Sequence, residues 1–451
     1  MFTLSFLKKL FSASQSLLTS DQTVRQVVTD SRKKAKNSLF VPIIGDTFNG
    51  HDFIHQAIEH GAIAALWDET IPVPNDVPES FVFFFVKDTT NGLQQLAKEY
   101  RDKVNPIVVG ITGSNGKTTT KDLVKAVVQT TKKTHATEGN FNNHIGLPLT
   151  ILQMKKDTEV LVLEMGMNHF GEIDVLTKIA QPNYAIITNI GESHIEHLGS
   201  RSGISRAKLE IKNGLQSDGY LLVDGDEALL HHLREEKYVI TCGFNQINDV
   251  RINKVYLHAQ TTTFEVNGQK YTIPLLGKHH AKNAAFAVEV ASFLQIDHKK
   301  VQQGFDSFTH SNMRFEWLEG KNNVSIINDA YNASPTSMKA AIEVVKQIEG
   351  YSHKGLVLGD ILELGKQSKS FHRSIAETIG GPISFVFTFG EHAKTISDDV
   401  QKANETITCK HFATKQQLIE ALQNHLHEDT LLLFKASRGM KLEDVIQEII
   451  Q

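Results

Sequence analysis

The stretch of the chain with the clearest chemical potential runs from Ile107 to Thr120, where an apolar run leads into glycines, a lysine and three threonines. Such glycines let the backbone approach an anion closely. Lys117 could reach the β and γ phosphates of a nucleotide, and Thr118 could place its hydroxyl on Mg²⁺. The stretch therefore predicts an ATP site formed by Gly113, Ser114, Asn115, Gly116, Lys117, Thr118 and Thr119.

The spacing departs from the strict phosphate-loop pattern at one place. That pattern requires a glycine five positions before Gly116, where this chain has Ile111 and carries glycines at 110 and 113 instead. An ordinary glycine-rich turn between a strand and a helix is the alternative interpretation. Turn chemistry alone does not explain Gly-Lys-Thr-Thr after a β-branched run, so we expect ATP binding.

Length and composition restrict the remaining possibilities. With 451 residues, the chain should form two to four domains. Its net charge is −4 and it has no basic stripe, so we do not expect nucleic-acid binding. Cys242 and Cys409 are far apart in the sequence, which argues against a disulfide framework or a zinc ribbon and favours a reducing, cytoplasmic compartment.

No apolar run approaches the roughly 18 residues of a membrane span, so we expect no membrane insertion. Apolar residues occur between Phe2 and Leu18, but Lys8 and Lys9 interrupt them and no small-residue cleavage site follows. This pattern predicts an amphipathic first helix, not a signal peptide. We expect the protein to be a monomer.

Strand-like runs alternate with helical stretches in two series, which predicts the α/β fold class with parallel sheets covered by helices. The runs are 107–112, 160–163, 184–188 and 220–223 in the first series, and 324–327, 355–358, 385–389 and 431–434 in the second. Apolar alternation around Asn267-Gly268 predicts a hairpin appended to the first series. We therefore expect a small mixed domain at 1–104, a central ATP-binding domain at 105–312, and a Rossmann-like domain at 313–451.

Ligands of open parallel sheets bind beyond the carboxyl ends of the strands, and this rule selects further residues. Glu164 ends one strand-like run, and His194 lies in the loop after the next. A carboxylate beside a triphosphate is a natural Mg²⁺ ligand, whereas imidazole is not a preferred one, and His197 is a rival for His194. Lys208 lies on an expected amphipathic helix, where a single lysine is usually solvated.

These segments together resemble the Mur ligase family over nearly the whole chain. Residues 110–119 match the ATP loop of that family, including the glycine placement that departs from the strict pattern, and residues 163–166, 189–194 and 207–211 match its metal-site segments. The resemblance implies two Mg²⁺ ions held by Thr118, Glu164, His194 and Lys208. It also implies that Lys208 carries a carbamate formed from CO₂.

Other matching segments point to particular substrates. Residues 139–148, 328–335 and 359–365 resemble those of family members that add D-alanyl-D-alanine to UDP-N-acetylmuramoyl-tripeptide. The resemblance implies that Asn142 and Asn143 bind substrate, and that Ser31, Arg32 and Thr47 belong to a UDP-binding face of the first domain. Capping and turn chemistry is the alternative explanation for that face.

The resemblance also assigns nucleotide contacts in the second half of the chain. It implies that Asn283 lies near adenine, and that Arg314 and Asp329 lie near phosphate and ribose; a hinge ion pair is the alternative for Arg314. The segment 435–440 matches one usually written Lys-Gly-Ser-Arg, but Ala436 replaces the glycine, which leaves the geometry of that loop open.

The mechanism implied is amide formation through an acyl phosphate, with Lys117, Lys208 and His194 as the catalytic residues and the C-terminal domain closing over ATP. The sequence identifies no base for the incoming amine. It leaves open whether the third residue of the tripeptide is meso-diaminopimelate or lysine. The alternatives are another ligase of this superfamily, a nucleotide-controlled switch, and a nucleotide-binding protein without catalysis.

Overall fold

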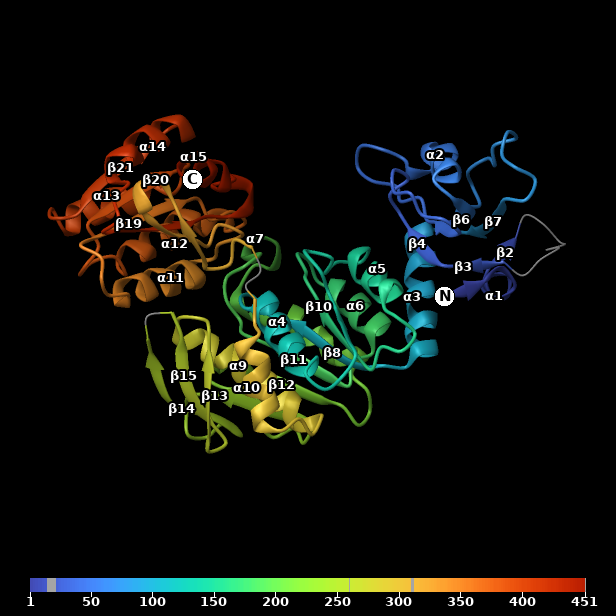
Figure 1. Cartoon of the computed structure of the whole chain (residues 1–451), viewed down its shortest axis with the longest axis horizontal. Helices are drawn as coiled ribbons and strands as arrows, with labels where there is room; N and C mark the ends of the chain where they lie inside the picture. Colours follow the sequence, from blue (N-terminus) through green and yellow to red (C-terminus); the bar gives the residue numbers. More distant parts are fainter. Residues whose placement is uncertain (14–21, 259, 310–311, 451) are drawn as a thin grey trace.

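The computed structural model describes residues 1–13, 22–258, 260–309 and 312–450. Its three principal sheets follow one another along the chain, and each belongs to a separate body. Figure 1 shows the central body flanked by the N-terminal body on one side and the C-terminal body on the other. Among the residues described, no helix is both long and apolar enough to cross a membrane.

The N-terminal body is built on a five-stranded sheet with the order β2-β7-β6-β5-β4. The first helix, α1, is shorter than the expected amphipathic segment, because it ends at Leu10 and a short strand follows; residues 14–18 lie outside the described part of the chain. The elements of this body are β1 (Phe2–Thr3), α1 (Leu4–Leu10), β2 (Ser12–Ala13), β3 (Thr23–Val24), β4 (Gln26–Val28), β5 (Ser38–Phe40), α2 (Ile54–Glu59), β6 (Ala62–Asp68), β7 (Val82–Val86) and α3 (Thr89–Val104).

Helix α3 leads directly into the central sheet. Its N-terminal capping residue is Asp88, whose side chain accepts a hydrogen bond from the Asn91 backbone N–H. Its C-terminal capping residue is Asn105, which is in the left-handed conformation. Pro106 then prevents the helix from continuing, and the next strand starts one residue later. The helix also packs along α5 of the central body, so it joins the two bodies by contact as well as by sequence.

The central body contains a nine-stranded sheet with the order β16-β15-β14-β13-β12-β11-β8-β10-β9. Pairing is parallel from β9 to β14, and β15 and β16 form the antiparallel hairpin expected at Asn267-Gly268, where both residues have positive φ. Its strands are β8 (Ile107–Thr112), β9 (Thr134–Ala136), β10 (Val160–Glu164), β11 (Tyr184–Ile187), β12 (Tyr220–Asp224), β13 (Val239–Gly243), β14 (Val250–Leu257), β15 (Thr262–Val266) and β16 (Gln269–Ile273).

Helices cover both faces of this sheet, which is why its inner strands are continuous apolar runs. Every residue of β10 is buried, and so is every residue of β8 after Ile107. The helices are α4 (Lys117–Val128), α5 (Gly146–Gln153), α6 (Glu172–Ala180), α7 (Ile195–Leu198), α8 (Arg201–Leu209), α9 (Lys278–Phe293) and α10 (His298–Asp306).

The C-terminal body repeats the α/β plan on a six-stranded sheet with the order β17-β18-β22-β19-β20-β21. Only the edge pair β17 and β18 is antiparallel within this sheet as described. Its elements are β17 (Glu316–Glu319), β18 (Ser325–Asn328), α11 (Pro335–Gln347), β19 (His353–Gly359), α12 (Ser368–Ala376), β20 (Phe385–Phe389), α13 (Lys394–Ala403), β21 (Thr408–Phe412), α14 (Lys415–Leu422), β22 (Thr430–Lys435) and α15 (Glu443–Ile449). The expected α/β class is therefore confirmed.

Candidate nucleotide and metal site

A cavity of about 360 Å³ lies where the central and C-terminal bodies meet. The central body contributes the loop after β8, the end of β11, the end of β12 and the start of α9. The C-terminal body contributes Arg314, Asp329, Lys435 and the first turns of α11. The cavity therefore lies at the carboxyl ends of the central strands, where ligands of open parallel sheets bind.

The loop between β8 and α4 has the geometry of an anion cradle. Gly113 has φ +150° and Gly116 has φ +78°, and a Cβ at Gly113 would lie 1.8 Å from the Thr188 hydroxyl oxygen. Gly116 stands immediately before α4, so the free N–H groups of that helix point into the cavity and favour a negative charge there. The glycine at 113, where the strict pattern has none, is thus required by the close approach to Thr188.

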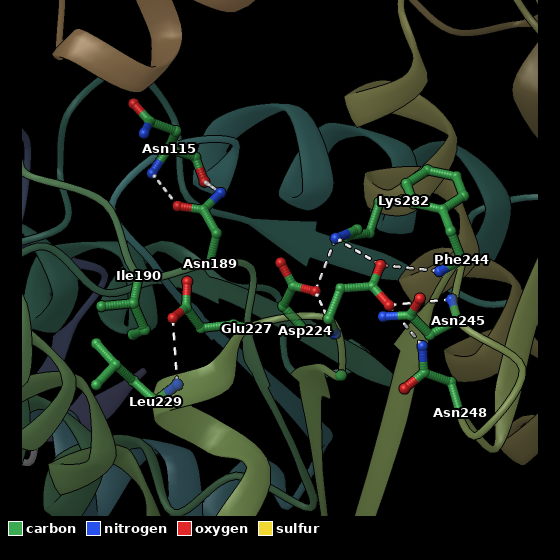
Figure 2. Close-up of polar contacts among 12 residues, drawn as sticks. Asn115, Asn189, Ile190, Asp224, Glu227, Leu229, Phe244, Asn245, Asn248 and Lys282 are labelled. Carbon is green, nitrogen blue, oxygen red and sulfur yellow. Dashed lines mark hydrogen bonds and ion pairs between the residues drawn. The ribbon is translucent and has the colours of Figure 1, made fainter.

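The backbone of Asn115 is fixed from the central sheet. Its N–H donates to Oδ1 of Asn189 at 3.0 Å, and its carbonyl accepts from Nδ2 of Asn189 at 2.9 Å and from the Thr188 hydroxyl at 2.6 Å. Figure 2 shows the paired contacts between the two asparagines. The end of β11 therefore determines the shape of the phosphate loop.

The Lys117 side chain does not project into open solvent. Its ammonium donates to the carbonyl oxygens of Gly113 at 2.7 Å and Ser114 at 3.3 Å. Burial lowers the pKa of Lys117, and the carboxylate of Glu164 opposes that shift. The lysine is folded back on its own loop and would have to exchange these carbonyls for phosphate oxygens.

Two buried polar atoms of the loop have no hydrogen-bond partner within the described residues. They are the hydroxyl of Ser114 and Nδ2 of Asn115, both in residues that line the cavity. Buried polar groups are nearly always satisfied in folded proteins, so orphaned donors that line a cavity fit an absent polar ligand. A nucleotide triphosphate, which is rich in acceptor oxygens, has the matching chemistry.

Glu164 lies at the end of β10 with two partners. Its carboxylate accepts from the Thr118 hydroxyl at 2.8 Å and from Nδ2 of Asn142 at 2.8 Å. The carboxylate and the hydroxyl are oxygen ligands of the kind that Mg²⁺ prefers. The structure thus brings together Thr118, Glu164 and Asn142, which the sequence placed in metal and substrate roles.

His194 engages the C-terminal body. Its Nδ1 lies 2.5 Å from Oε2 of Glu363, and His194 adopts a left-handed φ of 63° at the start of α7. In the part of the chain that is described, no group of three or more His, Cys, Asp or Glu side chains has the arrangement of a metal site. Because Glu363 holds Nδ1, the other ring nitrogen of His194, Nε2, is the one available for the predicted metal role.

Lys208 is buried, contrary to the usual behaviour of a lysine on an amphipathic helix. Its side chain is 2% exposed, and burial lowers its pKa well below the ordinary value, with the nearby charge of Lys117 adding to the shift. Arg206, two positions earlier in the same helix, lies over the ring of Phe170. Glu210 accepts backbone hydrogen bonds from Gly171 and is not paired with Lys208.

The three residues predicted to contact the nucleotide from the second half of the chain, Asn283, Arg314 and Asp329, all line the cavity. Arg314 donates to the Thr118 hydroxyl at 3.2 Å and lies over the ring of Tyr331, so it is not a hinge ion pair in this structure. Asp329 pairs with Lys435 at 2.5 Å. Asn283 is buried against Gly116, because a Cβ at that glycine would lie 2.8 Å from its side chain. Asn283 therefore lies beside the phosphate loop.

The remaining predicted substrate residues lie outside this cavity. Ser31 is buried and donates to Oε1 of Gln56 at 2.7 Å, Arg32 pairs with Asp30 on the surface, and Thr47 is exposed. Asn143 accepts from the backbone N–H groups of Ile145 and Gly146 at the start of α5. The contacts of Arg32 and Asn143 are those of ordinary capping and turn chemistry, whereas Ser31 is held by a residue 25 positions away.

Sequence reasoning missed an ionic cluster at one end of the cavity. Lys282 pairs with Asp224 at 2.7 Å and with Asp226 at 3.1 Å, and its ammonium lies 5.3 Å from the centre of the Phe244 ring. Figure 2 shows Asp224 of β12, Lys282 of α9 and Phe244, which follows β13, converging on one another. Asp224 ends β12, so the rule that selected Glu164 could also have found it.

The fold and the cavity define a nucleotide-binding α/β protein of the phosphate-loop type, in which a C-terminal body completes the site. Comparison with known families agrees. The models described as "Mur ligase family, catalytic domain", "Mur ligase middle domain" and "Mur ligase, glutamate ligase domain" match residues 23–101, 111–291 and 313–438.

Individual proteins match over nearly the full length. The UDP-N-acetylmuramoyl-tripeptide--D-alanyl-D-alanine ligase of Bacillus subtilis (strain 168) is 46% identical over 435 residues, which are 96% of this chain and 94% of that protein. A crystal structure of MurF from Acinetobacter baumannii has a TM-score of 0.89 at 29% identity and covers 99% of this chain and 98% of its own. MurF from Thermotoga maritima in complex with ADP has a TM-score of 0.81 at 29% identity, with 94% and 97% covered. The chain belongs to the Mur ligase family and is of the MurF type within it.

Proposed function

We propose that this protein is an ATP-dependent ligase that joins D-alanyl-D-alanine to UDP-N-acetylmuramoyl-tripeptide in the synthesis of peptidoglycan precursors, in the cytoplasm. One observation carries the proposal: a phosphate loop lines the cavity between the central and C-terminal bodies, and beside it the Glu164 carboxylate accepts from Thr118 and from Asn142. The full-length similarity to relatives of that name supports the choice of substrates.

The reaction would proceed in two steps. The terminal carboxylate of the tripeptide attacks the γ phosphorus of ATP, which forms an acyl phosphate and releases ADP. The amine of D-alanyl-D-alanine then attacks the acyl carbon, and inorganic phosphate leaves as the amide forms. Catalysis of such steps depends mostly on positioning and on the neutralisation of charge.

The protein's own donors account for much of that neutralisation. The N–H groups at the start of α4 would bind the phosphates, and Lys117 would move from the carbonyls of Gly113 and Ser114 to the β and γ oxygens. Arg314 lies beside Thr118 and could offer its remaining N–H groups to a phosphate. Asp329 is paired with Lys435 and lines the cavity, and its carboxylate would accept from a ribose hydroxyl.

The oxygen atoms of Thr118 and Glu164 fit Mg²⁺, because both are hard ligands and lie 2.8 Å apart at the edge of the phosphate loop. We propose that Thr118, Glu164, His194 and a carbamylated Lys208 would hold two such ions, which when bound would offset charge on the phosphoryl oxygens. A carbamate requires a neutral amine, and the lowered pKa of the buried Lys208 favours that form.

The N-terminal body would bind the UDP end of the peptide substrate. The residues proposed for this face are Ser31, Arg32 and Thr47, while Asn142 and Asn143 would contact the peptide nearer the reacting carboxylate. We propose the domain limits 1–104, 105–312 and 313–451, and a monomer as the active form. Closure of the C-terminal body over ATP would exclude water from the acyl phosphate.

Phosphate release tests the proposal directly. Purified protein should release phosphate from ATP when UDP-N-acetylmuramoyl-tripeptide and D-alanyl-D-alanine are both present, and only at background level when either is omitted. A nucleotide-controlled switch would release phosphate without them. Phosphate release that is independent of both substrates would refute the ligase assignment.

A further inference from the structure

The N-terminus of α11 is one place where the C-terminal body contacts the phosphate loop. The hydroxyl of Ser334 donates to Oδ1 of Asn115 at 3.0 Å, across 219 positions of sequence. Ser334 is 1% exposed, so this contact is shielded from water. One side chain of the C-terminal body thus reaches the loop that we propose binds phosphate.

The hydroxyl of Ser334 takes part in two hydrogen bonds, as the donor in one and the acceptor in the other. As the residue that begins α11, it accepts a hydrogen bond from the Ser337 backbone N–H at 3.2 Å, and its own N–H donates to the Ser337 hydroxyl at 2.9 Å. A serine hydroxyl can accept and donate at the same time, so the proton remains available for Asn115. Glycine could begin the helix nearly as well but could not make the second contact.

The side chain of Asn115 is the part of this residue that contacts the C-terminal body. Because its N–H and carbonyl are held by Asn189 and Thr188 of the central body, only its side chain is free to respond to the neighbouring body. The next residue, Gly116, precedes the helix that presents N–H groups to the cavity. A contact to Asn115 therefore acts on the loop at the centre of the proposed phosphate site.

A second contact joins the same helix end to the central body. The Glu192 carboxylate accepts from the Thr336 hydroxyl at 2.7 Å and from the Thr336 backbone N–H at 3.4 Å. Helix α11 has no acidic residue in its own first turn, so Glu192 supplies the negative charge that favours a helix N-terminus. Docking of the C-terminal body thus satisfies groups on both sides of the contact.

We propose that Ser334 is a positioning residue that couples docking of the C-terminal body to the conformation of the phosphate loop through Asn115. The inference rests on the proposed function in one respect, which is that the cavity binds a nucleotide. Coupling between two equilibria is reciprocal, so the docked body should tighten nucleotide binding and a nucleotide should favour docking.

The test compares ADP binding by titration calorimetry in the wild type and four variants of the full chain. Ser334→Gly removes the contact to Asn115 but leaves a residue that begins a helix well, and it should weaken ADP binding about fivefold, the factor that corresponds to one net hydrogen bond of about 1 kcal/mol. Thr414→Gly is the matched control, because it removes the hydroxyl that caps α14 in the same C-terminal body, and Thr414 does not line the cavity. It should bind ADP within twofold of the wild type.

Asn115→Ala, alone and combined with Ser334→Gly, completes the test. If the coupling runs through Asn115, Ser334→Gly should change ADP binding by less than twofold in the Asn115→Ala background. Wild-type affinity in Ser334→Gly, or an equal loss in both backgrounds, would overturn the inference. ADP binding needs neither ligase substrate, so a protein that binds ADP in this pattern but forms no amide would contradict the proposed function alone.

Discussion

Replacing Lys208 by methionine should lower activity while it maintains or raises the stability of the protein without CO₂. The Lys208 side chain is 2% exposed. Burial is the main cause of its lowered pKa, and Lys117 adds to it. The protonated form of Lys208 therefore destabilises the folded state.

The magnitude follows from two opposing effects. An unsatisfied buried polar group costs about 1 to 3 kcal/mol, and a charged one costs more. Methionine has a similar shape and volume, so repacking should cost less than about 1.5 kcal/mol. In CO₂-free buffer at pH 7, Lys208→Met should be as stable as the wild type or more stable by about 1 kcal/mol, which corresponds to a rise in Tm of about 2 to 4 °C.

The buried Lys208 should also make the stability of the wild type depend on pH. The pKa of Lys208 is lower in the folded chain than in the unfolded one, so the unfolded chain binds more protons between those two pKa values. The stability of the wild type should therefore rise with pH through that window, and the contribution should be complete above the unfolded pKa. Lys208→Met should lack this rise, which urea unfolding from pH 7 to pH 10 would measure.

Turnover should fall by about 10² or more in Lys208→Met, because the anionic carbamate would be missing. Short-chain carboxylic acids such as acetate should partly restore Lys208→Ala, which leaves space for them, but not Lys208→Met, which fills it. Removing bicarbonate should lower wild-type turnover and leave both variants unchanged. A bicarbonate-independent wild type, together with turnover in Lys208→Met within tenfold of it, would refute the carbamate.

Three further substitutions test the rest of the site. Lys117→Met should lower kcat/KM by about 10² or more. It should also lower the free energy of unfolding by about 1 kcal/mol, because two carbonyls lose their donor. Near-normal turnover would show that Lys117 does not belong to the phosphate site. Lys282→Met should cost about 1 to 3 kcal/mol in urea unfolding, because Asp224 loses its charged donor while Asp226 keeps three other donors. It should also raise KM for ATP, and unchanged values would show the cluster to be passive. Glu164→Gln should raise the Mg²⁺ concentration for half-maximal turnover at least about tenfold, because a carboxylate is a far better ligand than an amide, and an unchanged Mg²⁺ titration would exclude Glu164 as a ligand.

The parts of the site that sequence could predict are those that local pattern determines. Gly113, Gly116 and Lys117 follow a buried strand and precede a helix, so their placement follows from strand-to-loop-to-helix geometry. The carboxyl-end rule found Glu164 in the same way. Both series of strands were likewise evident as apolar runs, because a parallel sheet buries each strand on two faces.

The parts that sequence could not predict are pairings between distant segments. His194 meets Glu363 across 169 positions, and Lys282 meets Asp224 across 58. No periodicity encodes such contacts, because they depend on how the bodies and helices are packed. The burial of Lys208 depended on packing in the same way, and a single helical lysine gives no sign of it.

The most direct test of the central claim is the mass of the product. With UDP-N-acetylmuramoyl-tripeptide, D-alanyl-D-alanine, ATP and Mg²⁺, mass spectrometry should detect the UDP-linked pentapeptide, with one ADP and one phosphate formed per amide bond. The assay should be run in parallel with tripeptides that carry meso-diaminopimelate and lysine, and with a UDP-dipeptide plus a free diamino acid. A pentapeptide from either tripeptide is the predicted result. A tripeptide product from the dipeptide, with no pentapeptide formed, would contradict the account.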